Sequence, residues 1–442
     1  MGYRVSEHFM IYIKQHLLPF CAVFLSLALI GLSLLLLFGR KDCEPLQNPH
    51  LQAMADIAEI NDAAIDEFEF SPEMRAVWIA TVGNINFPSK NTLGADELKK
   101  EIDMIVSNSV SLGFNAIFFQ IRPASDALYN SHIFPASSFL VKNQGDVPPL
   151  DVLDYLVNAA HSKNIEVYGW INPLRVTYYG DDGLSSLSAD NPALSGKYRV
   201  TKYADGMYYY DAGDENVRQL IASGVCEVAQ NYDVDGIVFD DYFYPYPKYD
   251  PTGTPIEFDD EETYLKFSNG EDLYTWRRNN VNSLISECYH ALKNVDAECE
   301  FGVSPFGVWK NISSDINGSK TNGMEAYDTI FCDALAWIKE GTVDFLMPQL
   351  YWDRENSNCP YEELLSWWNT ATENTDVKLY VSQAAYKYND FKNDEISAQI
   401  GISRCKSNYF GSALYGYAYI ISDPDLKQDI NCAYSKAVTY YK

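Results

Sequence analysis

The sequence predicts a (β/α)8 barrel of the TIM type, preceded by one transmembrane helix and an acidic linker. Three observations support this fold class. Eight short apolar segments recur along residues 74–442, and amphipathic segments with helical spacing lie between them. The total of 442 residues also suits a single α/β barrel with additional segments. An open, doubly wound sheet is the structural alternative, and the count of eight favours the closed barrel.

The amino-terminal region contains a stretch that is long enough to span a bilayer. Residues 17–38 form 22 consecutive positions without a charge. Arg40 and Lys41 follow directly, in place of a small-residue cleavage site, which favours an uncleaved signal anchor over a cleaved signal peptide. We expect residues 1–16 to form a short tail and residues 39–73 an acidic linker. A large acidic domain that follows a first membrane-spanning segment most often lies on the extracellular side of the membrane. We therefore expect a single-pass protein of the cell membrane with an extracellular barrel.

The predicted strands are short runs rich in β-branched and aromatic residues. They cover residues 75–81, 116–123, 166–173, 235–242, 301–307, 345–352, 378–386 and 413–420. Most of them are apolar on both faces. This pattern is typical of parallel strands that are covered by helices.

The predicted helices show apolar residues at intervals of three and four positions. Four such sets are Leu98, Ile102, Ile105, Val106 and Leu112, followed by Gly113; Leu153, Leu156, Val157 and Ala160; Trp276, Leu284, Ile285, Cys288 and Leu292; and Phe331, Ala334, Trp337 and Ile338, followed by Gly341. Gly113 and Gly341 occupy the position where glycine commonly ends a helix.

Composition excludes several classes of partner. The net charge of −28 argues against binding to nucleic acid or to acidic lipid headgroups. The nine cysteines contain no CxxC pair, and the six histidines show no ligand spacing, so we expect no metal and no other cofactor. One or two disulfides stay possible for an extracellular body. Nothing in the sequence predicts an oligomeric state.

In barrels of this type the active site lies at the carboxyl ends of the strands, and this regularity is called the barrel rule below. The polar and aromatic candidates there are Gln120 and Arg122 after the second strand, Asn172 and Arg175 after the third, Asp240, Asp241 and Tyr242 after the fourth, Ser304 and Trp309 after the fifth, Gln349, Tyr351, Trp352 and Asp353 after the sixth, and Gln383 and Tyr386 after the seventh. Tyr242, Tyr244 and Tyr246 suggest an aromatic rim beside the two aspartates. Asp423 follows the eighth strand. Any one of them could simply cap a loop, but the whole ring together indicates a binding site.

Six motifs follow one another in order within residues 73–422: "MRAVWIAT", "FNAIFFQIRP", "VYGWINPLR", "DGIVFDDYFYP", "FGVSPFGVW" and "MPQLYW". Together they resemble glycosyl-hydrolase-like family 10, a bacterial group of barrel proteins. The resemblance implies a glycan-hydrolysing barrel, and some members act on peptidoglycan strands. We therefore expect a membrane-anchored glycoside hydrolase whose partner is a cell-wall or extracellular polysaccharide. An N-acetylhexosamine polymer, in particular the peptidoglycan glycan strand, is the favoured substrate.

Asp240 and Asp241 are the best candidates for the catalytic carboxylates, and either could be the general acid. Side chains alternate along a strand, so a regular strand would direct only one of them into the site. Other strand ends have few carboxylates, which suggests that a substrate N-acetyl group acts as the nucleophile. Arg122 and Arg175 could bind a lactyl or uronic carboxylate, or pair with the aspartates. The alternative function is a non-catalytic carbohydrate-binding barrel that scaffolds cell-wall enzymes.

Overall fold

The computed structural model describes residues 70–178, 183–391, 394–435 and 439–441. The predicted membrane span at residues 17–38 and nearly all of the predicted linker lie outside the described residues. Within the described part of the chain, no helix is both long enough and apolar enough to cross a bilayer.

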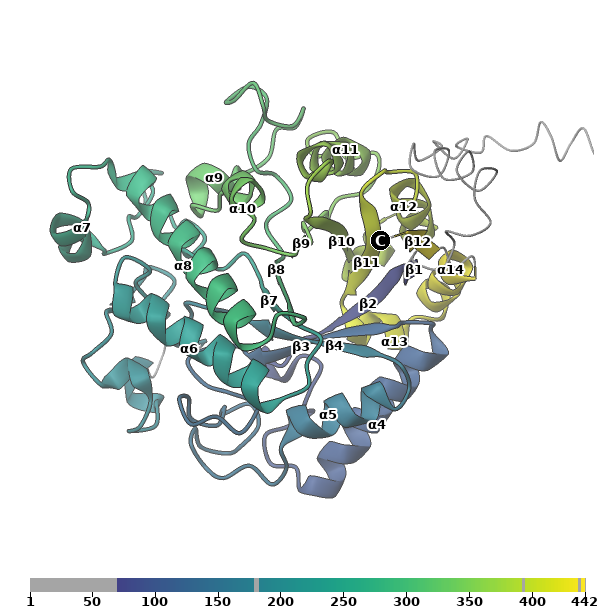
Figure 1. Ribbon diagram of the computed structural model, residues 1–442, viewed down its shortest axis with the longest axis horizontal. Coiled ribbons are helices and arrows are strands. Elements are labelled where there is room, and N and C mark those ends of the chain that lie inside the picture. The colour runs from purple at the N-terminus through teal and green to yellow at the C-terminus, as the bar shows by residue number, and fades with distance from the viewer. Residues whose placement is uncertain (1–69, 179–182, 392–393, 436–438, 442) are drawn as a thin grey trace, which may run out of the picture. The chain divides into compact units, whose positions relative to one another are not determined.

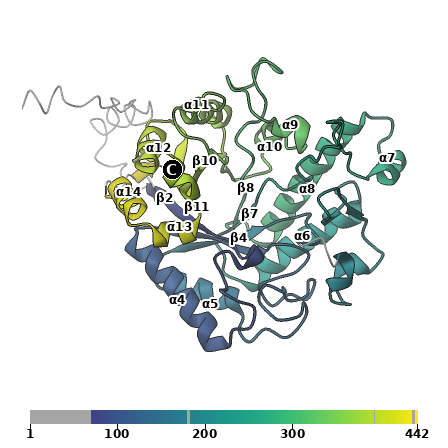
Figure 2. The same cartoon turned by 180° about the vertical axis from the view of Figure 1, so that it is seen from behind.

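Eight parallel strands close into a barrel, which confirms the predicted fold class. In order around the barrel they are β2 (Met74–Ile79), β3 (Ala116–Arg122), β4 (Glu166–Ile171), β7 (Gly236–Phe239), β8 (Glu300–Val303), β9 (Phe345–Leu346), β10 (Lys378–Ala384) and β11 (Tyr409–Tyr415). The pairing of β11 with β2 closes the barrel. Figures 1 and 2 show these strands at the centre, with the helices around them.

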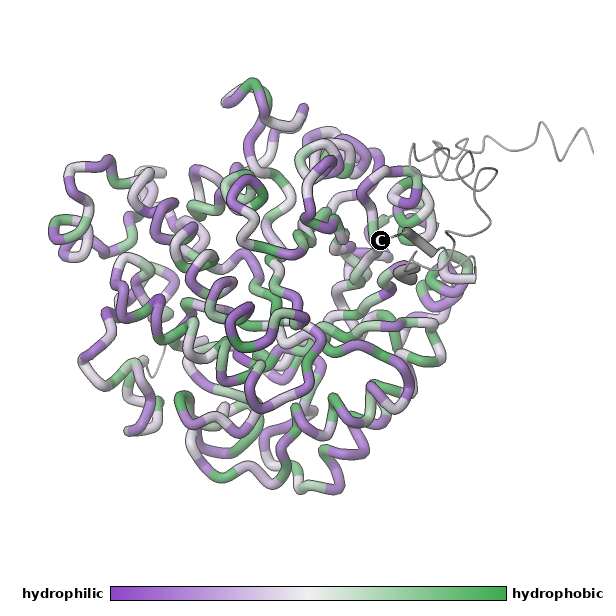
Figure 3. The backbone as a smooth tube through the Cα atoms, in the orientation of Figure 1, coloured by the Kyte–Doolittle hydropathy of each residue, from purple (hydrophilic) through white to green (hydrophobic). Residues whose placement is uncertain are grey.

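The surrounding helices follow the strands along the chain. The longer ones are α4 (Ala95–Ser111), α5 (Val152–His161), α6 (Glu215–Asn231), α8 (Leu273–Val295), α10 (Ala334–Glu340), α11 (Tyr361–Thr372), α12 (Glu395–Ser403) and α14 (Pro424–Tyr434). Short helical segments are η3 (Val82–Asn84), η4 (Gly183–Ser186), η5 (Pro192–Leu194), α7 (Glu261–Phe267), α9 (Ala326–Thr329), η6 (Ala385–Asp390) and α13 (Tyr417–Ser422). Hydrophobic and hydrophilic residues alternate along the helices (Figure 3), and their apolar faces pack on the outside of the barrel.

Two small antiparallel sheets lie outside the barrel. One is a hairpin of β5 (Val200–Lys202) and β6 (Tyr208–Tyr210) in the connection between β4 and α6. The other pairs β1 (Phe70–Pro72) with β12 (Thr439–Tyr441), so the first and last described strands are neighbours.

Aromatic side chains fill the interior of the barrel. The ring of Trp78 lies 4.7 Å from that of Phe118 and 5.1 Å from that of Trp170, measured between centroids. Tyr168 and Phe345 pack against Phe118 below them. The interior is therefore a packed core, and only its upper layer can contact a ligand.

The structure corrects three details of the predicted elements. The eighth strand begins at Tyr409, not at Ala413, and Tyr417 already starts α13, because Gly416 turns the chain with a φ of 117°. Phe331 does not belong to a helix, since its own φ is 57°. Strand β9 is only two residues long, because Pro348 cannot donate a backbone hydrogen bond to a longer ladder.

A buried ion pair ties the start of the barrel to the last part of the chain. The carboxylate of Glu73, which is 1% exposed, accepts two hydrogen bonds from Arg404. The Nε–Oε1 and Nη2–Oε2 distances are 2.8 and 2.6 Å. This bidentate contact spans 331 positions of sequence, so it exists only when the barrel is closed.

We expect the substitution Glu73→Gln to lower the free energy of unfolding by about 3 kcal/mol, because it removes the buried carboxylate that pairs with the guanidinium of Arg404. Urea denaturation followed by circular dichroism measures this change. The exposed residue Glu340 provides a matched control, and Glu340→Gln should change the value by less than about 0.5 kcal/mol. Equal stability of the Glu73→Gln variant and the unmodified chain would contradict a structural role for the ion pair.

Candidate active site

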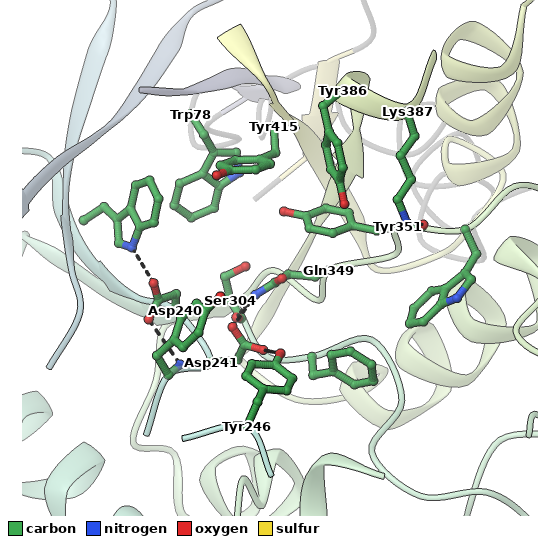
Figure 4. Close-up of a pocket in the computed structure, with 14 residues that line it drawn as sticks. Trp78, Asp240, Asp241, Tyr246, Ser304, Gln349, Tyr351, Tyr386, Lys387 and Tyr415 are labelled. Atoms are coloured by element: carbon green, nitrogen blue, oxygen red, sulfur yellow. Dashed lines mark hydrogen bonds between the residues drawn. The ribbon is translucent and has the colours of Figure 1, made fainter. Parts of the chain in front are cut away.

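A cleft of about 340 Å³ opens at the carboxyl ends of the barrel strands. It is lined by Trp78, Trp170, Asp240, Asp241, Tyr242, Tyr246, Ser304, Phe306, Gln349, Tyr351, Trp352, Tyr386, Lys387 and Tyr415. These residues lie in or after seven of the eight strands, and Figure 4 shows how their side chains surround the cleft. Its position agrees with the barrel rule, and its size suits part of a small ligand or a sugar unit.

Asp240 and Asp241 both reach this cleft, although strict strand alternation would have turned one of them away. Strand β7 ends at Phe239, so Asp240 is the last residue in register with the inward face. The chain then turns, and the amide of Phe243 donates to the carbonyl of Asp241 at 2.9 Å. This turn redirects the Asp241 side chain into the same cleft.

Neutral hydrogen-bond donors hold the carboxylate of Asp240. Its Oδ2 accepts from Trp170 Nε1 at 2.9 Å and from Asn172 Nδ2. Asn172 is held in turn by Gln120, whose Nε2 donates to Asn172 Oδ1 at 2.6 Å. The Oε1 of Gln120 accepts from the amide of Thr81 at 2.8 Å. This chain of contacts fixes the orientation of Asp240 from behind the cleft.

The surroundings of Asp240 favour its protonated form. Burial and the neighbouring charge of Asp241 raise the pKa of Asp240 to about 7. The charge of Arg175 and the hydrogen bond from Trp170 oppose this rise without cancelling it. Asp240 therefore carries a proton through the acidic range and releases it near neutral pH, as a general acid requires.

Asp241 has a different set of partners. Tyr246 donates its hydroxyl to Asp241 Oδ2, and Gln349 Nε2 donates to Oδ1 at 2.9 Å. Gln349 also donates to the carbonyl of Ser304 at 3.0 Å, which fixes the direction of its amide group. Burial raises the pKa of Asp241, and the hydrogen bonds from Tyr246 and Gln349 counteract the rise. These donors offset part of the effect of burial, which still leaves the pKa of Asp241 above its usual value.

Aromatic rings form the remaining walls of the cleft. Tyr351 stacks on Tyr415 with an interplanar angle of 17°, and Tyr386 meets both rings edge-on. Farther out, Trp352 lies edge-on to Phe306, with 5.5 Å between the ring centroids. Aromatic faces around a carboxylate pair provide stacking surfaces for the apolar faces of a ligand such as a sugar.

The structure places the candidates Gln120 and Asn172 behind Asp240 instead of on the cleft surface. Tyr242, Ser304, Gln349, Tyr351 and Trp352 do line the cleft, together with the two aspartates.

Arg122 does not reach the cleft, because a bulge changes the face to which it points. Gln120 pairs with Trp170 of β4, but Arg122 pairs with the next residue, Ile171, so Arg122 shares the outward face. Its guanidinium is fully buried, 3.9 Å from the ring centroid of Phe134, and burial lowers its pKa. None of its nitrogens has a hydrogen-bond partner among the described residues. Arg122 is therefore unavailable to a substrate carboxylate in this conformation.

Four other predicted residues also lie outside the cleft. Arg175 stacks over the ring of Tyr242 at 4.6 Å, where its charge acts on the aspartates without an ion pair. Trp309 packs against Trp367 and donates to Asp333. Asp353 accepts from the amide of Glu355 in a turn, and Gln383 faces outward and donates to Tyr361. Asp423, noted after the eighth strand, caps α14.

Tyr246 and Tyr386, which the sequence placed in an aromatic rim and after the seventh strand, do line the cleft. Sequence reasoning did not select five other lining residues: Trp78, Trp170, Phe306, Lys387 and Tyr415. Trp78 packs against Phe118 in the barrel core and also lines the cleft. Strand alternation could have indicated Trp78, Trp170 and Tyr415, since each occupies an inward position at a strand end. No local pattern distinguishes Lys387, because its place depends on a contact with Tyr351.

Comparisons with known proteins agree on the class of this chain. A family model described as "Glycosyl hydrolase-like 10" matches residues 73–398. Glycosyl hydrolase YngK of Bacillus subtilis (strain 168) is 38% identical over 323 residues, which cover 72% of this chain and 62% of YngK. Glycosyl hydrolase DigH of Escherichia coli (strain K12) is 34% identical over 333 residues, which cover 72% of this chain and 74% of DigH. The chain thus matches less than two thirds of the length of YngK.

Among solved structures, the glycoside hydrolase domain of PgaB (BpsB) from Bordetella bronchiseptica superposes with a TM-score of 0.51 at 12% sequence identity. The match covers 83% of this chain and 100% of that domain. At this identity the similarity shows a shared fold alone.

The raised pKa of Asp240 predicts a distinct dependence of stability on pH. The folded pKa of about 7 lies above the unfolded value of about 4, so the folded chain binds an extra proton between these values. The stability that comes from this proton is complete below about pH 4 and is lost as the pH rises through about 7. Relative to Asp240→Asn, the free energy of unfolding of the unmodified chain should fall by about 1.4 kcal/mol per pH unit in this window.

Urea denaturation of both chains at four pH values between 4.5 and 8 measures this slope. Two parallel curves would show that Asp240 titrates normally. The variant Asp353→Asn provides the control, because Asp353 lies outside the cleft and its substitution should leave the slope unchanged.

Proposed function

The chain belongs to the glycosyl hydrolase-like 10 family, and we propose that it is a membrane-anchored glycoside hydrolase. Its substrate is a cell-wall or extracellular polysaccharide that contains N-acetylhexosamine, with the peptidoglycan glycan strand as the favoured case. The observation that carries this proposal is the pair of buried carboxyl groups, Asp240 and Asp241, in an aromatic cleft at the strand ends.

In this mechanism Asp240 is the general acid. Its protonated carboxyl group gives the proton to the glycosidic oxygen as the bond between C1 and that oxygen breaks. The raised pKa of Asp240 supports this role, because the group holds its proton up to about pH 7. The contacts from Trp170 and Asn172 hold Oδ2 of Asp240 and so fix the orientation of its carboxyl group in the cleft.

The substrate's own acetamido oxygen attacks C1 from the opposite face and forms a cyclic oxazolinium intermediate. The ionised Asp241 accepts a hydrogen bond from the acetamido N–H and stabilises the positive charge that develops on this group. Water then attacks C1 and gives one proton to the Asp240 carboxylate, which restores the acid and reopens the ring. Tyr246 and Gln349 hold Asp241 in place through both steps.

This arrangement supports an enzyme over the alternative of a carbohydrate-binding scaffold. A scaffold gains nothing from burying two adjacent carboxyl groups, and the desolvation cost would have to be offset elsewhere. Neither aspartate forms an ion pair with a described basic side chain, and the nearby Arg175 stacks on Tyr242 instead. Both carboxyl groups thus remain directed at the cleft.

We expect Asp240→Asn and Asp241→Asn each to lower the rate of glycan cleavage on the order of 10²- to 10⁴-fold, since each removes a group that acts in the transition state. Full-length protein would be incubated with purified peptidoglycan, intact and stripped of stem peptides. Soluble products and new reducing ends are measured by mass spectrometry. Asp353→Asn is the matched control, an acidic residue after β9 that lies outside the cleft, and it should retain full activity.

The pH profile separates the two aspartates. For the unmodified chain, kcat/KM should fall as the pH rises above about 7, because Asp240 loses its proton there. Removing the charge in Asp241→Asn should move this limb of the residual activity to lower pH, since the Asp241 carboxylate helps to raise the pKa of Asp240. Full activity in either Asn variant would refute the mechanism. Bound but uncleaved glycan with the unmodified chain would instead favour the scaffold.

We also propose that residues 17–38 anchor the chain in the cell membrane with the barrel outside. The uncharged length of this segment and the charged residues after it support the proposal. Protease added to intact cells should digest the barrel of a carboxyl-terminally tagged chain, and an alkaline wash should leave the undigested chain in the membrane fraction. Deletion of residues 17–38 should release it from that fraction. A barrel protected from external protease would contradict the orientation.

A further inference from the structure

A single basic side chain, Lys387, lies among the described residues that line the cleft. Figure 4 shows it on the wall opposite Asp240 and Asp241, beside Tyr386 and Tyr351. Its presence is unexpected in a chain with a net charge of −28, whose surface repels acidic ligands over most of its extent.

The ammonium group of Lys387 is held in a fixed place but is not neutralised. Lys387 lies in η6, directly after β10, and its Nζ donates to the carbonyl of Tyr351 at 2.9 Å. An ammonium group has three donors, so two remain for a ligand. Elsewhere among the described residues, Lys310 and Lys378 form ion pairs with carboxylates, but Lys387 forms none.

The residue that holds the Lys387 ammonium, Tyr351, is close in sequence to Gln349, which binds one of the two aspartates. Gln349 binds Asp241, and Tyr351, two positions further, binds Lys387. Two residues span at most about 7 Å between their Cα atoms. Asp241 and Lys387 also line the same cleft, so a glycan that fills the cleft can contact both side chains.

The arginines that the sequence suggested for a substrate carboxylate do not serve this purpose. The guanidinium of Arg122 is buried behind β3, and that of Arg175 stacks on Tyr242 outside the cleft. Lys387 is the described basic group that a ligand in the cleft can contact.

We propose that Lys387 is a specificity residue that binds a carboxylate substituent on a sugar next to the bond that is cleaved. The proposal rests on the proposed glycosidase function and narrows its substrate class to acidic glycans. The carboxylate can be a lactyl ether on an N-acetylhexosamine or the acid group of a uronic acid, since both present the same charge. The Nζ of Lys387 lies 5.6 Å from the ring centroid of Tyr386, and Trp352 lines the same cleft, so both offer aromatic faces to the ring that carries the substituent.

The test compares full-length protein on glycans that differ in the acidic group. Peptide-free peptidoglycan strands carry free lactyl carboxylates, and the same strands after methylamide coupling carry none. A polymer of alternating N-acetylhexosamine and uronic acid distinguishes the second source of carboxylate. Lys387→Met keeps the apolar stem without the charge, and Lys387→Arg keeps the charge as the matched control.

We expect Lys387→Met to raise KM for the acidic strands about tenfold, the loss of one charge-assisted hydrogen bond, with little change in kcat. The methylamide strands should show no difference between the variant and the unmodified chain. Lys387→Arg should retain most of the preference for the acidic strands. High salt should weaken binding of the acidic strands alone.

Dissociation constants measured by calorimetry make the outcome independent of turnover. If the protein binds the acidic strands in a charge-dependent way and Lys387→Met abolishes this binding, the Lys387 proposal is supported. If no glycan is cleaved in the same experiments, only the proposed glycosidase function is overturned. Cleavage with equal effects of Lys387→Met on acidic and methylamide strands assigns Lys387 to supporting Tyr351 and refutes the proposal. Absence of binding to every one of these glycans also refutes it.

Discussion

Closure of eight parallel strands determines where every strand end of this protein lies. In a closed parallel barrel all carboxyl ends meet at one rim, so residues separated by hundreds of positions come to surround one cleft. Trp78 and Ser382, for example, are 304 positions apart and share a hydrogen bond of 3.1 Å. The aromatic packing below them closes the interior and gives the cleft its floor.

The electrostatics of the cleft depend on the absence of a described basic side chain in direct contact with the two aspartates. Two adjacent aspartates are buried there, and the groups that touch them are neutral donors, namely the side chains of Trp170, Asn172, Tyr246 and Gln349. Arg175 acts on them only from behind the ring of Tyr242. A cation in direct contact would have lowered both pKa values. Because Arg175 stacks on Tyr242 and does not contact the aspartates directly, Asp240 keeps a pKa of about 7. This value lies in the range that acid catalysis near neutral pH requires.

The local pattern of the sequence indicated most of the fold and part of the site. Strands and helices could be read from apolar periodicity, because packing of each element on its neighbours imposes that period. The aspartate pair, with Tyr351 and Trp352, followed from the rule that barrels bind ligands at strand ends. The rule failed where the backbone departs from regular geometry. A bulge turned Arg122 outward, and an early end of β7 brought Asp241 inward.

The sequence by itself determined the alternation of elements, the number of strands and the location of the acid pair at the end of the fourth strand. Each of these depends on residues that are close together in the chain. Tertiary structure alone decided which polar side chains enter the cleft and in which protonation state. The partners that decide it are remote: Trp170 lies 70 positions from Asp240, and Gln349 lies 108 positions from Asp241. Burial and neighbouring charge set a pKa, and both arise only when the strands have closed.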